Sequence, residues 1–317
     1  MTILPSVAAT IGQTPLLALD RLARGLPGRV LAKLETANPG GSVKDRIALA
    51  IIEAAERDGR LKPGGTVVEL TSGNTGIGLA IVCAVKGYRM VAVMSEGNTV
   101  ERRRMLQAVG AEVVLVPQVG RPRPGQVSGA DLARVEEKTR ELAKRRKAFR
   151  PDQFLNPDNV AAHEHGTGRE IREQTGGRVD AFCALVGTGG TFVGVARALK
   201  ARKPAVRCYA VEPASAPVLA GRRVRNPRHK LQGGGYALVP PLWDPACCDG
   251  FLTATDSEAI RVARRLGREE GICAGFSSGA NVAAALTLAR RAKPGATIVT
   301  VIADTGLKYL STDLFPS

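Results

Sequence analysis

Aromatic side chains are scarce in this sequence of 317 residues, since tryptophan, tyrosine and phenylalanine together make up 4% of it. Proteins that bind nucleic acid by stacking need aromatic platforms, and no helix-turn-helix or zinc-finger pattern is present instead. The net charge of +16 at pH 7 would attract polyanions, but the arginines are scattered over many expected helices. We therefore predict no nucleic-acid partner.

Long hydrophobic runs are also missing. No apolar stretch approaches the roughly 20 residues needed to span a bilayer. Residues 1–15 have neither the basic start nor the apolar centre of a secretory signal. The sequence thus predicts a cytoplasmic protein with no membrane partner.

Cysteine and histidine occur in no pattern typical of a metal site. The six cysteines contain no Cys-x-x-Cys pair, which favours reduced, structural thiols. Of the three histidines, His163 and His165 lie two residues apart, with no cluster of cysteine or carboxylate side chains around them. We expect surface or capping roles for both, and no metal.

Strand-like apolar segments do occur, and they alternate with helical ones along almost the whole chain. Such alternation is typical of the α/β class, in which mostly parallel sheets are covered by helices. A charged interval rich in proline and glycine divides the series, so we predict two lobes with a boundary near residues 149–153. The expected strands are residues 30–34, 66–70, 90–94, 112–116, 181–186, 207–211 and 298–302.

Lys44 lies in the run NPGGSVKDR (residues 38–46), after an expected turn and at the start of an apolar helix. Ser42 is a residue type that often caps helices. The positive end of the helix dipole and the loss of water would lower the pKa of the Lys44 amine and raise its neutral fraction. A lysine that acts as a nucleophile needs that property.

Two glycine-rich turns each follow an expected strand and precede a helix. The first, TSGNTG (residues 71–76), offers hydroxyl, amide and backbone N–H groups for a carboxylate. The second, GTGGT (residues 187–191), suits a phosphate, because its glycines let an anion approach the backbone. Neither is a Walker A loop, and Phe192 replaces the last glycine of a dinucleotide-binding fingerprint.

Two further loops complete the pattern. GFSSGA (residues 275–280) precedes a small, apolar helix expected over residues 280–288, and Asp304 follows the last strand. Ligands of open α/β sheets bind at the carboxyl ends of the strands. We therefore expect the lysine, a carboxylate cradle, a phosphate cradle and a serine to meet in one pocket.

These motifs, in this order and at these separations, closely resemble the cysteine synthase (O-acetylserine sulfhydrylase) and cystathionine β-synthase family of fold-type II enzymes, which use pyridoxal 5'-phosphate. DTGLKYLST (residues 304–312) is a further match, and the resemblance runs from residue 11 to residue 315. It implies a fold like that of the tryptophan synthase β-subunit. The larger lobe, residues 1–38 and 152–317, would bind the phosphate, and a smaller mobile lobe, residues 39–151, would carry Lys44 and the substrate loop.

The resemblance also implies roles for individual residues. Lys44 would form the internal aldimine and move the α-proton, Asn74 would bond the 3'-oxygen of the cofactor, and Ser277 would face its pyridine nitrogen. The phosphate ligands would be Gly187, Thr188, Gly189, Gly190 and Thr191. The carboxylate of the substrate would be bound by Thr71, Ser72, Gly73, Thr75 and Gln153.

The implied reaction is β-replacement on an O-activated L-serine through an aminoacrylate intermediate, with O-acetyl-L-serine and sulfide giving L-cysteine and acetate. Alternatives are an O-phosphoserine-dependent cysteine synthase, a cystathionine β-synthase, a diaminopropionate-type synthase, a serine or threonine dehydratase, and a catalytically silent binding protein. The arginine-rich residues 220–230 favour the phosphoserine alternative. The family further implies a homodimer and a possible serine acetyltransferase partner.

Overall fold

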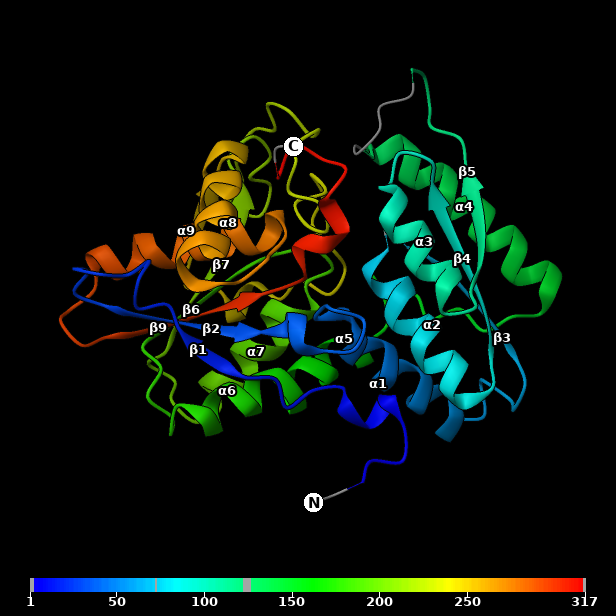
Figure 1. The fold of residues 1–317 in the computed structure, drawn as a ribbon, viewed down its shortest axis with the longest axis horizontal. Helices are drawn as coiled ribbons and strands as arrows, with labels where there is room; N and C mark the ends of the chain where they lie inside the picture. The colour runs from blue at the N-terminus through cyan, green and yellow to red at the C-terminus, as the bar shows by residue number, and fades with distance from the viewer. Residues whose placement is uncertain (1–2, 72, 122–126, 316–317) are drawn as a thin grey trace.

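The computed structural model describes residues 3–71, 73–121 and 127–315. They form two β-sheets with helices on both faces, and the sheets lie side by side in Figure 1, the larger on the left and the smaller on the right. All strand pairs but one are parallel. The predicted α/β class with mostly parallel, helix-covered sheets is therefore confirmed.

The larger sheet contains strands from both ends of the chain. Its order is β1-β2-β9-β6-β7-β8, and β1 alone runs antiparallel to its neighbour. In the centre, Val30 lies opposite Ile298 and Leu31 opposite Val299. The strands are β1 (Leu16–Ala18), β2 (Arg29–Leu34), β6 (Ala181–Leu185), β7 (Arg207–Pro213), β8 (Gly250–Ala254) and β9 (Thr297–Ile302).

The smaller sheet comes from one continuous segment of the chain. It has the order β3-β4-β5, with β3 (Thr66–Leu70), β4 (Arg89–Ser95) and β5 (Glu112–Val116). Both of its faces are apolar, as a buried parallel sheet requires. One face packs on α1, α2 and α3, and the other on α4.

Helices cover both sheets because each has one apolar face. On the larger sheet, α8 and α9 lie on one face and α6 and α7 on the other (Figure 1). The helices are α1 (Lys44–Arg57), α2 (Asn74–Lys86), α3 (Val100–Ala108), α4 (Gly129–Arg146), α5 (Asp158–Ala162), α6 (Arg169–Gln174), α7 (Gly190–Lys200), α8 (Asp256–Glu270) and α9 (Phe276–Arg291). Shorter helical turns are η1 (Val7–Thr10), η2 (Glu35–Ala37), η3 (His163–Gly168), η4 (Pro245–Cys247) and η5 (Gly306–Tyr309).

Several local predictions differ from the structure. Two strands were not expected: β1, which has three residues, and the edge strand β8, whose residues are mostly half-exposed or exposed. Ser42 is not the N-cap of α1, because Val43 holds that position; the Ser42 hydroxyl instead accepts a hydrogen bond from the Lys44 N–H at 3.3 Å. Helix α9 begins four residues before the predicted start, so Ser277 lies in its first turn.

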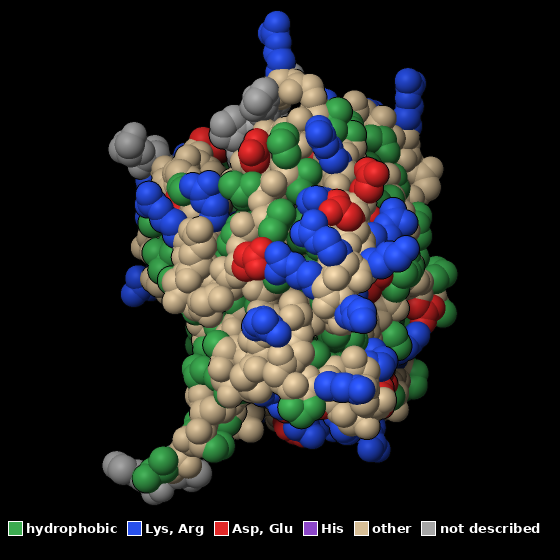
Figure 2. Space-filling view, turned by 90° about the vertical axis from the view of Figure 1, so that its right-hand side faces the viewer, with side chains coloured by type: hydrophobic (Ala, Val, Ile, Leu, Met, Phe, Trp, Pro, Cys, Tyr) green, Lys and Arg blue, Asp and Glu red, His purple; other side chains and the backbone are tan. Residues whose placement is uncertain are grey.

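The surface on the side of the smaller sheet mixes both signs of charge. Figure 2 shows lysine and arginine side chains there with acidic side chains between them. Several of these groups pair, including Arg146 with Glu112 and Arg150 with Glu136. None of the described helices is long and apolar enough to cross a membrane.

Candidate active site

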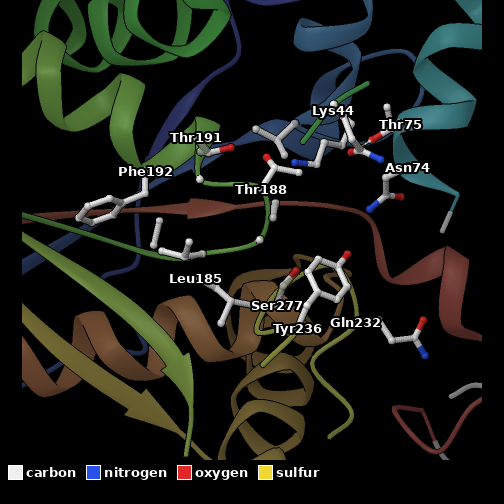
Figure 3. A pocket seen from close by; sticks show the side chains of 18 of the residues that line it. Lys44, Asn74, Thr75, Leu185, Thr188, Thr191, Phe192, Gln232, Tyr236 and Ser277 are labelled. Atoms are coloured by element: carbon white, nitrogen blue, oxygen red, sulfur yellow. Dashed lines mark hydrogen bonds between the residues drawn. The ribbon is translucent and has the colours of Figure 1, made fainter. Parts of the chain in front are cut away.

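One cavity opens where the two sheets face each other, at the carboxyl ends of their strands. Figure 3 shows Lys44, Asn74 and Thr75 on one side of it and Ser277 and Tyr236 on the other. Of the predicted site residues, the cavity wall includes Lys44, Asn74, Thr75, Gln153, Gly187, Thr188, Gly189, Thr191 and Ser277.

Lys44 is the first residue of α1, and the end of that helix directs its side chain into the cavity. Burial lowers the pKa of its amine from the ordinary 10.5 to about 8, although the negative charge of Asp304 opposes the fall. Within the described residues the amine has no hydrogen bond or ion pair. At pH 7 about one such amine in ten is neutral, compared with roughly one in three thousand at the ordinary pKa.

This pKa predicts how fast Lys44 reacts at different pH values. Only the neutral amine attacks an acylating reagent, so modification of Lys44 in the ligand-free protein should rise with pH and level off above about pH 8. Mass spectrometry of tryptic peptides measures the rate, with the exposed Lys62 as an internal reference. A rate that keeps rising to pH 10.5 would contradict the assignment.

The loop after β6 lines the cavity with Gly187, Thr188, Gly189 and Thr191. The N–H groups of residues 188–191 donate to no other group in the described part of the chain, and they lie at the start of α7, where the helix dipole is positive. There is no space here for larger side chains: a Cβ at position 187 would lie 2.3 Å from the Gly233 carbonyl oxygen. The loop is therefore built to bring its backbone close to an anion.

Two buried side chains, which the sequence analysis did not place at the site, support this loop. Asn159 donates from Nδ2 to the Thr188 hydroxyl at 2.9 Å. His163 is fully buried, with Nε2 3.1 Å from the Thr191 hydroxyl and Nδ1 3.0 Å from that of Thr167. The prediction of a surface or capping role for His163 is thus wrong, because the π-helical turn η3 directs its ring inward.

Burial lowers the pKa of His163 well below its ordinary value, and the positive charges of Lys44 and Arg46 lower it further. The ring is therefore neutral at physiological pH. It holds the hydroxyl of Thr191 in place and adds no charge to the loop.

Replacing Gly190 with alanine tests the loop. A Cβ at this position would lie 1.9 Å from Oδ1 of Asn159, a side chain that also bonds Thr188. We expect the variant to bind pyridoxal phosphate at least tenfold more weakly in an absorbance titration, because the loop must shift. Gly267→Ala in α8 is the control, since the nearest atom to its Cβ would be 4.0 Å away. Unchanged affinity in a folded Gly190→Ala protein would contradict the role of the loop.

The loop after β3 places α2 against the cavity. Thr71 accepts hydrogen bonds from the Gly73 and Gly76 N–H groups, each at 2.9 Å, so its hydroxyl oxygen is used within the loop. Asn74 and Thr75, the first two residues of α2, face the cavity. Ser72 lies outside the described residues, and Thr71, Gly73 and Gly190 lie behind the cavity wall.

Gln153 reaches the same side of the cavity from the segment after α4. Its Oε1 accepts from the Thr75 hydroxyl at 2.6 Å, and its Nε2 donates to the Leu70 carbonyl oxygen at 3.2 Å. The buried carboxyl group of Glu69 holds the backbone beneath it, accepting from the N–H groups of Asp152 at 2.9 Å and Gln153 at 3.4 Å. One amide hydrogen of Gln153 remains available for a ligand.

The arginine-rich segment lies elsewhere. The side chains of Arg222, Arg223, Arg225 and Arg228 are exposed, and none of them lines the cavity. Arg102 of α3 does line it, buried and bonded to the Tyr309 hydroxyl at 2.7 Å. The sequence analysis did not identify Arg102, because nothing in its sequence context distinguishes it from the other helical arginines.

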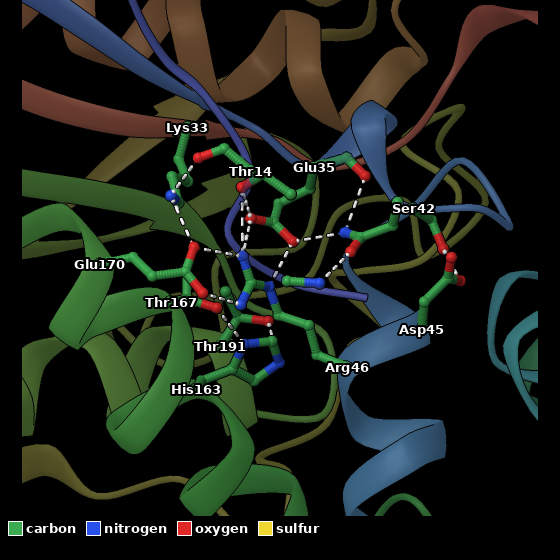
Figure 4. Close-up of polar contacts among 12 residues, drawn as sticks. Thr14, Lys33, Glu35, Ser42, Asp45, Arg46, His163, Thr167, Glu170 and Thr191 are labelled. Atoms are coloured by element: carbon green, nitrogen blue, oxygen red, sulfur yellow. Dashed lines mark hydrogen bonds and ion pairs between the residues drawn. The ribbon is translucent and has the colours of Figure 1, made fainter. Parts of the chain in front are cut away.

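Figure 4 shows a buried ion network around Arg46, which lies two residues after Lys44 in the chain. Arg46 bonds two carboxylates, Glu35 at 2.7 Å and Glu170 at 2.6 Å, and Lys33 approaches Glu170 to 2.7 Å. Thr14 bonds both Arg46 and Glu35. The network thus joins α1 to the strands and turns of the larger sheet, two residues after Lys44.

The cavity fits the cofactor that the sequence resemblance implies. An amine with a lowered pKa suits an aldehyde, the free N–H groups of residues 188–191 suit a phosphate, and the hydroxyl of Ser277, a residue that is 8% exposed on the opposite wall, suits an unprotonated pyridine nitrogen. A dianion would gain from the dipole of α7. The residues present therefore match pyridoxal phosphate in chemistry and position.

Comparisons with known proteins agree with this geometry. Residues 7–304 match the family model described as pyridoxal-phosphate dependent enzyme. A cysteine synthase of Staphylococcus aureus (strain N315) is 45% identical over 98% of this chain and 96% of its own.

Solved structures give the same result. An O-ureido-L-serine synthase has a TM-score of 0.90, with 42% identity over 99% of this chain and 96% of its own. The cysteine synthase of Entamoeba histolytica has a TM-score of 0.90, with 38% identity over 99% and 91%. The chain belongs to the family of pyridoxal-phosphate dependent enzymes, in the group that contains the cysteine synthases.

Proposed function

We propose that this enzyme replaces the acetate of O-acetyl-L-serine with sulfide, forming L-cysteine. The observation that carries the proposal is a cavity that combines the Lys44 amine with an anion-binding loop, in a chain 45% identical to a cysteine synthase over almost its whole length. The bound cofactor supplies an electron sink for negative charge at the α-carbon of the substrate.

Each residue then has a defined task. The Lys44 Nζ takes the proton from the α-carbon, acetate leaves from the β-carbon, sulfide adds there, and Lys44 returns the proton. The N–H groups of residues 188–191, with the Thr188 and Thr191 hydroxyls, bind the phosphate of the cofactor. Asn74 donates to its 3'-oxygen, and Ser277 faces its ring nitrogen. A serine is a weak partner for a protonated ring, and this suits elimination better than reactions that need a stronger electron sink.

The substrate carboxylate binds between α2 and Gln153 in this proposal. The contacts come from the loop at residues 71–75 and from the free amide hydrogen of Gln153. We further propose that residues 39–151 form a lobe that closes on residues 1–38 and 152–317 when the amino acid binds. Closure would exclude water, which competes with sulfide.

Gln153→Ala is expected to raise the KM for O-acetyl-L-serine about tenfold and to change kcat less, because one hydrogen bond to a charged ligand is worth about 1.4 kcal/mol or more. Steady-state kinetics measure both constants. Gln107→Ala, an exposed glutamine of α3, is the control. A fall in kcat with no change in KM would place Gln153 outside the carboxylate site.

O-acetyl-L-serine is favoured over O-phospho-L-serine by the position of the arginines. A phosphate leaving group needs a cation near the β-carbon, and the exposed Arg222, Arg223, Arg225 and Arg228 lie outside the cavity wall. Arg102 does line the cavity, but its guanidinium is bonded to the Tyr309 hydroxyl. The acceptor is less restricted, since a solved relative that is 42% identical to this chain is an O-ureido-L-serine synthase. Another β-substituted alanine is thus the second candidate product.

A product assay tests the proposal. The enzyme loaded with cofactor is incubated with either ester or with free serine, and with sulfide, homocysteine, ammonia or no acceptor, and the products are identified by mass spectrometry. We expect cysteine from O-acetyl-L-serine and sulfide, at least tenfold faster than any other product. Pyruvate from free serine would indicate a dehydratase, and cystathionine as the main product a cystathionine synthase. If no combination of donor and acceptor gave a product, the protein would be a catalytically silent binding protein.

We also propose a cytoplasmic homodimer whose cavity admits the carboxyl-terminal tail of a serine acetyltransferase. The apolar side chains of Ile3, Leu4 and Val7 are exposed in the single chain and suit an interface between two copies. Light scattering on the purified protein measures the oligomeric state. Titration with an acetyltransferase tail peptide measures the second association.

A further inference from the structure

Lys308 has a fully buried ammonium group beside the active site. It lies in η5, and its exposed fraction is 0%. The Nζ atom donates to the carbonyl oxygens of Gly40 at 2.8 Å and Gly41 at 3.4 Å, and to Oδ1 of Asn74 at 2.8 Å. One cation thus contacts both the turn before Lys44 and the first residue of α2.

Burial lowers the pKa of Lys308 to about 8, while the negative charges of Asp304 and Asp45 oppose the fall and the positive charge of Arg102 adds to it. The amine is therefore mostly protonated at pH 7. A protonated lysine has three hydrogens to donate and no lone pair to accept with. Each of its contacts must consequently be with an acceptor.

The amide of Asn74 is held by two groups of opposite kind. Its Oδ1 faces the Lys308 ammonium, and its Nδ2 donates to Oδ2 of Asp304 at 2.8 Å. Because the ammonium only donates and the carboxylate only accepts, the reverse orientation of the amide would lose both bonds. The second Nδ2 hydrogen remains available to a ligand, and Figure 3 shows the amide nitrogen on the side of the cavity.

Asp304 is itself fixed by a chain of hydrogen bonds. Its Oδ2 also accepts from the Tyr309 hydroxyl at 2.7 Å, and that hydroxyl accepts from Nη2 of Arg102 at 2.7 Å. The Tyr309 ring packs edge-on against Phe276, with centroids 5.3 Å apart. The carboxylate is thus held against movement, and with it the nitrogen end of the Asn74 amide.

We infer that Lys308 is a positioning residue, which fixes the orientation of the Asn74 amide so that an N–H, and not the carbonyl oxygen, meets the 3'-oxygen of the cofactor. The inference rests on the role proposed above for Asn74. Lys308 would also have a second role, because the same ammonium holds the Gly40–Gly41 turn that precedes Lys44.

The inference predicts coupling between Lys308 and Asn74. Lys308→Met keeps the length of the side chain and removes the donors, so the amide can rotate and present its oxygen to the cofactor. We expect at least tenfold weaker binding of pyridoxal phosphate and a shifted visible band, because the 3'-oxygen loses a donor. Asn74→Ala should have effects of similar size. In the double variant, the affinity for pyridoxal phosphate should fall by less than about twofold beyond the fall in Asn74→Ala alone.

Controls separate positioning from stability. Lys33→Met removes another fully buried lysine, which bonds Thr14, Gln174 and Glu170 outside the cavity. It should lower Tm and leave the visible band in place. Lys308→Arg, which still only donates, should restore the band. If Lys308→Met does not fold, Lys308→Gln replaces it, because glutamine both donates and accepts and so no longer fixes the Asn74 amide.

The outcomes distinguish this inference from the proposed function. If the two substitutions lowered the affinity for pyridoxal phosphate by independent factors that multiply in the double variant, or if Lys308→Met had a normal visible band, the positioning role would be overturned. The wild-type enzyme would still form cysteine in that case. A wild-type enzyme that binds the cofactor and forms no cysteine would overturn the proposed function. The coupling of Lys308 to Asn74 would still be measurable in the binding titration.

Discussion

Replacing Lys44 with alanine is expected to lower the rate of cysteine formation by at least about 10³-fold. The amine moves the proton at the α-carbon, and positioned groups of this kind contribute roughly 10²–10⁴-fold. The variant also loses the group that holds the aldehyde of the cofactor. Turnover with O-acetyl-L-serine and sulfide measures the first effect. Mass spectrometry after borohydride reduction, which fixes the cofactor on its lysine, measures the second.

Lys62→Ala is a suitable comparison, since Lys62 is exposed and does not line the cavity. Its turnover and its reduced peptide should match the wild type. If Lys44→Ala retained more than a tenth of the activity, or if the cofactor were found on another lysine, the assignment of Lys44 would be wrong.

Replacing Arg46 with methionine is expected to destabilise the protein by about 3–5 kcal/mol. The guanidinium bonds Glu35 and Glu170, both buried, and its removal leaves one of them without a cationic partner. Losing one partner of a buried pair costs this much because the remaining charge stays in a medium of low polarity. Denaturant unfolding of the ligand-free protein measures the change.

The same network predicts how stability depends on pH. Burial would raise the pKa of Glu170, but its bonds and charge contacts with Arg46 and Lys33 hold it at about 2. A carboxyl group with a lowered pKa stabilises the fold fully above its ordinary value of 4.5, and this contribution is lost as the pH falls toward 2. Arg46→Met should therefore unfold in acid at a higher pH than the wild type.

Arg145→Met gives the matched comparison at the surface. Arg145 pairs with Glu141 at 3.4 Å, and both side chains are about half exposed or more. Such pairs are worth about 0–1 kcal/mol. A similar loss of stability in both variants would mean that the buried network does no more than an exposed ion pair.

The sequence alone predicted those parts of the site that depend on local structure. A strand followed by a glycine-rich turn and a helix indicates where backbone N–H groups gather, so the loops at residues 71–76 and 187–191 were expected at the cavity from their neighbours along the chain, while the role of Asn74 came from the family resemblance. Lys44 was also found from its neighbours along the chain. The expected strands in both sheets were correct because buried parallel strands are continuous apolar runs.

The supporting residues were not predictable in this way. Lys308 and Asn74 are separated by 234 positions, and Thr191 and His163 by 28, so their contacts depend on the packing of whole elements. A lone lysine or histidine more often lies at the surface. Strand β8 was missed because only Ala254 in it is buried, which leaves no apolar run.

The visible absorption spectrum of the purified enzyme, before and after O-acetyl-L-serine and then sulfide, tests the central claim most directly. We predict a cofactor band in the wild type that changes when the ester is added without an acceptor and returns when sulfide follows, with one cysteine formed per site. A band that responds to neither the ester nor sulfide would contradict β-replacement on O-acetyl-L-serine. A protein with no cofactor band after incubation with pyridoxal phosphate would contradict the assignment of the site itself.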